Sequence, residues 1–133
     1  MKSQIHEERM IALVIMDHQF KVKGNSEIIY KLYLNNLKGI NNWDLVDLSA
    51  PNIVGKYLLL TCKNFDEITT KEDPRNILYE LAVSTSLWER RISILSTFSF
   101  IRTNYFYDAL KISKILLNDK HDLIHKGVGW MLR

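Results

Sequence analysis

A chemically distinctive pair of side chains stands in the segment Asn-Asn-Trp-Asp-Leu-Val-Asp-Leu, residues 41–48. If this segment is helical, Trp43 and Asp47 share one face, and the indole ring stands beside the carboxylate. An indole face attracts a cation or a sugar face, and the carboxylate adds negative charge, so the pair suits a positively charged ligand or transition state. The structural alternative is a core tryptophan beside a solvated aspartate, and the segment alone leaves both interpretations open.

Composition predicts one domain over residues 1–133, because 133 residues with 47% hydrophobic side chains can form a single core and little more. No stretch has the length and apolar character of a membrane span or a signal peptide. Cys62 is the only cysteine, which excludes an internal disulfide and favours a cytoplasmic location. The net charge of +3 permits a polyanionic partner without requiring one.

Hydrophobic periodicity predicts helices and no strand pair. Helices are expected over residues 3–20, 26–37, 51–60, 87–101, 105–117 and 122–132, with two more between Asn42 and Pro51 and between Pro74 and the turn at 84–86. Ser3 and either Asn41 or Asn42 are predicted N-caps, and Pro51 is expected to begin a new helix antiparallel to the one before it. Residues 61–73 are predicted to form a long polar loop with no role that the sequence explains.

Four of these helices share a charged residue followed by small and apolar positions. The charged residues are Arg9, Asp47, Arg91 and Lys126, at intervals of 38, 44 and 35 residues. Such intervals are typical of HEAT-like units and predict a right-handed α-solenoid of antiparallel helix pairs, with these residues in a row on its concave face. A basic row suits phosphates, whereas the lone carboxylate of Asp47 suggests chemistry. The alternative is that amphipathic helices resemble one another by chance.

Other kinds of site find little support. His121 and His125 have the spacing of metal ligands on a helix, but beside Asp119 and Asp122 they are better explained as solvated or capping residues, so no metal is expected. Gly127 and Gly129 are interpreted as positions of close helix packing rather than a phosphate loop, and neither a nucleotide site nor a cofactor is predicted.

Three motifs together resemble a known family. They are Asn-Trp-Asp-Leu-Val-Asp at 42–47, Trp-Glu-Arg-Arg at 88–91 and Lys-Gly-Val-Gly-Trp-Met-Leu-Arg at 126–133. In this order they resemble the DNA alkylation repair proteins with HEAT-like repeats, the alkylpurine DNA glycosylases of the AlkD type. The resemblance implies that Asp47 is the catalytic aspartate, that Trp43 and Trp130 contact the sugar, and that Arg91 grips a phosphate.

The expected activity is hydrolysis of the N-glycosidic bond of cationic N3- or N7-alkylated purines in double-stranded DNA, such as that of the nucleoid. Arg9, Lys126 and Arg90 are candidates for further phosphate contacts, although Arg90 could be only a solvated neighbour. Asp44 is predicted to serve the helix start, and Trp88 to pack in the core.

Two alternatives remain open: a non-catalytic HEAT-like DNA-binding protein, and a helical-repeat scaffold for protein interactions. Because the resembling proteins have additional helices at both ends, the chain is expected to be incomplete there. Two chains could therefore associate through these ends.

Overall fold

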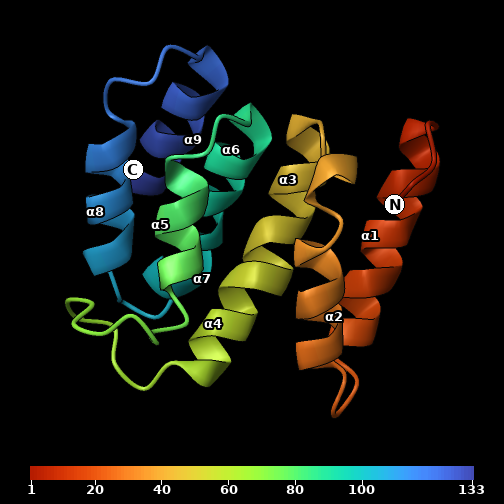
Figure 1. Cartoon of the computed structure of the whole chain (residues 1–133), viewed down its shortest axis with the longest axis horizontal. Helices are drawn as coiled ribbons and strands as arrows, with labels where there is room; N and C mark the ends of the chain where they lie inside the picture. Colours follow the sequence, from red (N-terminus) through yellow and green to blue (C-terminus); the bar gives the residue numbers. More distant parts are fainter.

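The computed structural model describes residues 1–133 and consists of helices, turns and loops without strands, which confirms the all-α prediction (Figure 1). The α-helices are α1 (His6–Phe20), α2 (Ser26–Leu34), α3 (Trp43–Ser49), α4 (Lys56–Thr61), α5 (Asn76–Ala82), α6 (Leu87–Ser96), α7 (Phe98–Ile101), α8 (Tyr107–Leu116) and α9 (Asp122–Leu132). A 3₁₀ turn, η1 (Leu37–Gly39), precedes α3, and a π-helical segment, η2 (Ala50–Gly55), joins α3 to α4. None of the helices has both the length and the apolar character needed to cross a membrane.

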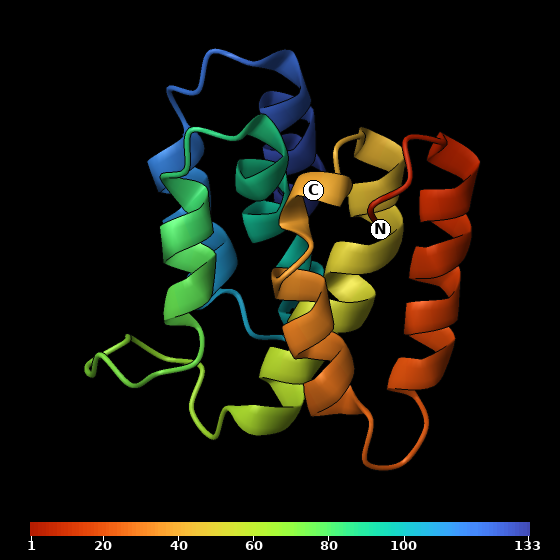
Figure 2. The same cartoon turned by 45° about the vertical axis from the view of Figure 1, so that its right-hand side comes forward.

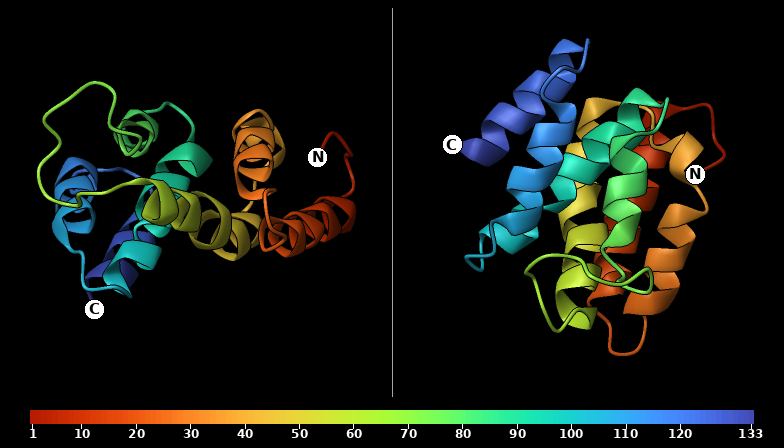
Figure 3. Two further views of the ribbon diagram at one scale, coloured as in Figure 1. Left: turned by 90° about the horizontal axis from the view of Figure 1, so that it is seen from below. Right: turned by 60° about the vertical axis from the view of Figure 1, so that its left-hand side comes forward.

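The helices form two layers. One layer contains α1, α3 with α4, α6 with α7, and α9, and each of these packs against the next (Figure 3). In the other layer, α2 packs on α1 and η2, while α5 packs on α6 (Figure 2). The first helix and the last two lie at opposite ends of the molecule, so a row of neighbouring helices runs along its length.

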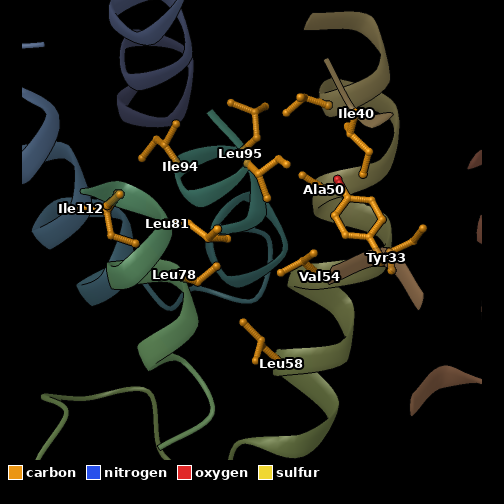
Figure 4. Close-up of a cluster of buried hydrophobic side chains, with 14 of the residues drawn as sticks. Tyr33, Ile40, Ala50, Val54, Leu58, Leu78, Leu81, Ile94, Leu95 and Ile112 are labelled. Atoms are coloured by element: carbon orange, nitrogen blue, oxygen red, sulfur yellow. The ribbon is translucent and has the colours of Figure 1, made fainter. Parts of the chain in front are cut away.

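A continuous cluster of 25 buried apolar side chains joins the two layers. Figure 4 shows its centre, where Tyr33 from α2, Val54 from η2 and Leu95 from α6 lie among the aliphatic side chains. The Tyr33 hydroxyl is fully buried and forms a 2.9 Å hydrogen bond with the Ser49 hydroxyl. This bond satisfies a polar group that would otherwise be costly to bury.

The prediction of two separate helices around Pro51 is wrong, because α3, η2 and α4 form one continuous helical path from Trp43 to Thr61. Proline lacks an N–H group and normally breaks a helix. Here the wider π-helical turn accommodates the proline within the helical path. The Ser99 hydroxyl of α7 also donates a 2.6 Å hydrogen bond to the Pro51 carbonyl.

The helix starts are confirmed at one position and corrected at two. The Asn42 side chain accepts a 2.9 Å hydrogen bond from the Trp43 N–H, as expected of an N-cap. Ser3 is not a cap, because α1 begins at His6 and the Ser3 hydroxyl accepts from the Ile5 N–H before the helix. The fifth helix begins at Asn76 rather than Pro74.

The long loop before α5 is anchored by an aromatic side chain that the polar composition concealed. Phe65 is buried, stacks on Tyr105 with ring centroids 4.5 Å apart, and meets Phe100 edge-on at 5.1 Å. The Arg75 guanidinium lies over the Phe65 ring, 5.5 Å from its centroid. These contacts fasten the loop to the segment that follows α7.

Arg75 is also the centre of a buried ionic cluster. It donates 2.8 and 3.1 Å hydrogen bonds to Asp73 and a 2.9 Å bond to Asp108 of α8, whose other oxygen accepts 2.6 Å from the Tyr79 hydroxyl. Burial raises the pKa of Asp108, although its partners oppose this effect. The hydrogen bonds from the Arg75 side chain lower the pKa of Asp73, an effect that partial burial opposes. The cluster therefore joins the loop end, α5 and α8.

The lowered pKa of Asp73 predicts a loss of stability in acid. Its ionised form is favoured in the folded protein, so its contribution is complete above the unfolded-state pKa of about 3.9 and is lost as the pH falls through the lower folded value. Urea denaturation of the wild type and Asp73→Asn between pH 7 and pH 3 should show the wild-type advantage shrinking below about pH 4. An advantage that stays constant down to pH 3 would contradict this assignment.

Gly55 predicts a second stability effect, because η2 crosses α6 and α7 without room for a side chain. A Cβ atom at Gly55 would press against the Ser96 carbonyl oxygen and lie 2.8 Å from the Ser99 hydroxyl. Gly55→Ala should lower the free energy of unfolding by about 1–3 kcal/mol, as measured by urea denaturation. Gly129→Ala is the control: a Cβ there meets nothing within 4 Å, so the substitution should stabilise α9 by about 0.5–1 kcal/mol.

Candidate active site

The candidate active site centres on an ion pair between two helices that lie far apart in the sequence. Arg91 of α6 donates from Nε and Nη2 to the two carboxylate oxygens of Asp47 on α3, and both distances are 2.9 Å. The Arg91 side chain is 6% exposed, whereas that of Asp47 is 21% exposed. The guanidinium is therefore almost enclosed, while the carboxylate keeps access to solvent or a ligand.

Arg91 has a third partner, which brings α9 into the site. Its Nη1 donates to the Leu123 carbonyl, in the first turn of α9. A Cβ on Gly127 would lie 3.3 Å from the same Nη1 and 3.1 Å from Leu95 Cδ2. Close packing is therefore confirmed as the explanation of Gly127, whereas it is wrong for Gly129, which faces open space.

Trp43 stands one helical turn before Asp47 and is 52% exposed. The structural alternative of a core tryptophan is therefore wrong. The neighbouring Asp44 lies in the first turn of α3, as predicted, and its carboxylate accepts a 2.8 Å bond from the Leu45 N–H. The Asp44 carboxylate also lies 2.8 Å from Nε2 of His6 on α1, within hydrogen-bond distance, and this contact fixes α1 beside the start of α3.

Trp130 is 46% exposed on α9, and its ring packs against Phe98 of α7 rather than against Trp43. The centroids of Trp130 and Phe98 are 5.7 Å apart, and the Arg102 guanidinium lies 5.8 Å from the Phe98 ring centroid. The structure thus brings Asp47 and Arg91 into direct contact with Trp43 alongside, and places Trp130 in a second aromatic group on the same layer of helices.

The remaining predicted cations have partners within the chain. Arg9 donates to the Ser3 carbonyl at 2.8 Å and to the Asn41 side chain at 3.0 Å, next to the start of α3. Lys126 forms an exposed 3.0 Å ion pair with Asp122. Their phosphate contacts stay predictions.

Arg90 has a structural role whatever its part in binding. It pairs with Asp119 at 2.7 Å and donates to the carbonyls of Ser84 and Thr85, which joins the turn before α6 to the turn before α9. Trp88, which was predicted to pack in the core, is partly buried and packs against the hydrophobic core. A DNA contact by Arg90 also stays a prediction.

Three groups that contact the candidate site residues were not predicted from the sequence. His6 reaches Asp44 only because α1 packs on α3, and nothing in the local sequence reports that packing. The acceptor at Leu123 is a backbone carbonyl, so the identity of the side chain there does not indicate a contact with Arg91. Phe98 could have been suspected as an aromatic residue seven positions after Arg91, but its contact with Trp130 depends on the α7–α9 arrangement.

The histidines of α9 do not form a metal site with their neighbours. His121 is the N-cap of α9, and its Nδ1 accepts a 3.2 Å hydrogen bond from the Leu123 N–H. The structure contains no group of three or more histidine, cysteine, aspartate or glutamate side chains placed to hold a metal ion.

The fold and the site define an all-α protein with an accessible, ion-paired carboxylate beside an exposed indole. The family model described as "DNA alkylation repair enzyme" matches residues 1–133, the whole chain. The chain therefore belongs to the DNA alkylation repair enzyme family, which confirms the resemblance carried by the three sequence motifs. Neither the curated proteins nor the solved structures gave a match.

The geometry of Arg91 predicts that lysine cannot replace it. A lysine ammonium lacks the planar fork that reaches both Asp47 oxygens while a third donor meets the Leu123 carbonyl. Arg91→Lys should therefore lower the free energy of unfolding by about 1.5–3 kcal/mol in urea denaturation. Arg102→Lys, at an exposed position without an ion pair, should change it by no more than about 0.5 kcal/mol. Equal effects of the two substitutions would contradict the structural role of Arg91.

Proposed function

We propose that the chain is a DNA glycosylase that hydrolyses the N-glycosidic bond of cationic N3- or N7-alkylated purines in duplex DNA. The observation that carries this proposal is the Asp47 carboxylate, which Arg91 holds by both oxygens while it remains accessible beside Trp43. Membership in the DNA alkylation repair enzyme family supports DNA as the substrate.

The chemistry of an alkylated purine explains why a carboxylate and an indole suffice. A purine alkylated at N3 or N7 is already positively charged, so the base can leave without being protonated by the enzyme. Positive charge then develops on the deoxyribose as the bond breaks, and an ionised carboxylate stabilises that charge. Asp47 has this role in the proposal, and it also positions the attacking water.

Trp43 complements Asp47 because its exposed ring can lie against the deoxyribose. An indole face favours cationic character by roughly 0.5–2 kcal/mol, depending on how far water is excluded. Trp130 would make a second sugar or backbone contact along the duplex, with Phe98 supporting its ring. No step of this scheme needs a metal ion or an organic cofactor.

Arg91 has two roles in the proposal. Three of its five N–H donors bind Asp47 and the Leu123 carbonyl, which fixes the orientation of the carboxylate. The Arg91 side chain is only 6% exposed, so its proposed phosphate contact is limited to the edge that reaches the surface. Arg91 therefore positions Asp47 first and contacts DNA second.

The layer of α1, α3–α4, α6–α7 and α9 is proposed to be the concave, DNA-facing side of a right-handed HEAT-like solenoid. All of the candidate site residues, Arg90 included, belong to helices of this layer, and the neighbouring helices pack in sequence order. A curved row of helices can follow a duplex without a deep pocket, which agrees with the exposure of both indoles.

Asp47→Asn tests the catalytic role. The substitution preserves the size of the side chain but removes its charge, so release of 7-methylguanine from alkylated duplex DNA should fall roughly 100-fold or more. Asp44→Asn is the matched control, since it changes the neighbouring aspartate on the same helix and leaves the Asp47–Arg91 pair in place. Undiminished release by Asp47→Asn would end the proposal for this residue.

Binding measurements made in parallel separate the rival functions. Salt-sensitive binding to duplex DNA without base release by the wild type would select a non-catalytic DNA-binding protein. Absence of duplex binding at low salt would select a scaffold for protein interactions. Both outcomes would overturn the glycosylase proposal.

A further inference from the structure

We propose that Lys56 and Arg102 form a second phosphate-binding site, which holds the DNA backbone away from the reacting nucleotide. This inference rests on the proposed action on DNA but concerns residues that the sequence motifs do not include. Lys56 is the first residue of α4, and Arg102 directly follows α7. The two side chains line one hollow between these helices.

The hollow has a volume of about 350 Å³ and is lined by Lys56, Leu59, Ser99, Arg102 and Thr103. It contains two cations and no carboxylate. Neither Lys56 nor Arg102 forms an ion pair within the chain. In contrast, Arg90, Arg91 and Lys126 each have an aspartate partner. The hollow therefore has positive charge that an external anion can neutralise.

The two hydroxyl groups of the hollow indicate that the cations must supply the binding energy. The Ser99 hydroxyl donates to the Pro51 carbonyl at 2.6 Å, and the Thr103 hydroxyl donates to the Phe100 carbonyl at 2.9 Å. Their protons are thus already used within the helices. An ammonium and a guanidinium remain as free donors, and phosphate oxygens are acceptors that suit both groups.

Helical continuity places this hollow at a defined interval from Asp47. Lys56 follows Asp47 by nine residues along the unbroken path of α3, η2 and α4, which corresponds to roughly 12 Å at about 1.5 Å or slightly less per residue. The hollow is therefore on the same continuous helix as Asp47 but away from it, so it would meet the backbone outside the reacting nucleotide.

A second connection links the hollow to the aromatic group of α7 and α9. The Arg102 guanidinium lies over the Phe98 ring, which also contacts the ring of Trp130. A strand that passes Trp130 would thus reach Arg102 next. The stacking also limits the freedom of the Arg102 side chain, which lowers the entropic cost of binding a phosphate.

The test is the salt dependence of binding to an undamaged duplex, measured by fluorescence anisotropy over a series of salt concentrations. Each lost phosphate contact reduces the slope of log K against log salt by about 0.9. The double variant Lys56→Gln with Arg102→Gln should therefore bind more weakly and lose up to about 1.8 from the slope. The control Lys23→Gln with Lys114→Gln removes two exposed, unpaired cations elsewhere and should retain the wild-type slope.

The outcomes distinguish this inference from the proposed function. A slope of the double variant equal to that of the wild type would overturn the second phosphate site, even if 7-methylguanine release continues. A reduced slope in the double variant alone would support the site, even if the wild type releases no base and the glycosylase proposal fails. An equal reduction in the control pair would show a general charge effect and would also overturn the site.

Discussion

The structure depends on the bidentate ion pair between Asp47 and Arg91. Enclosing a guanidinium costs desolvation free energy, and only good geometry with further hydrogen bonds offsets that cost. Both Asp47 oxygens and the Leu123 carbonyl provide these bonds, so the single side chain of Arg91 joins α3, α6 and α9. The same pair leaves the Asp47 carboxylate partly exposed. The same ion pair therefore holds the row of helices together and orients the Asp47 carboxylate.

Two other structural features hold the helices around this ion pair in place. The π-helical segment at Pro51 keeps α3 and α4 on one path, so Trp43, Asp47 and Lys56 are carried by a single support. On the far side, Arg75 fastens the long loop to α8 through Asp73 and Asp108. A loop that looks unconstrained in composition is thus held by a buried charge and a buried aromatic ring, and it stabilises the helices that back α6.

The distribution of charge explains the proposed DNA surface better than the net charge does. An excess of +3 on 133 residues is small, and several of the basic side chains are neutralised by nearby aspartates. These pairs serve the fold and the orientation of Asp47. Unpaired cations such as Lys56 and Arg102 can exchange counterions for phosphates more readily than the paired ones, because their charge is not already compensated.

The sequence alone predicted the helical class and most helix boundaries, because hydrophobic periodicity is a local property. The four candidate residues of the three motifs came from the resemblance to the family, and their roles stay predictions. The sequence also limited the cap of α3 to Asn41 or Asn42, of which the structure selects Asn42. Only the tertiary structure decided that Arg91 binds Asp47, that Trp130 meets Phe98 and that Pro51 does not divide its helix. Each of these involves contacts between helices up to 48 residues apart, where the partner is set by packing and not by neighbours along the chain.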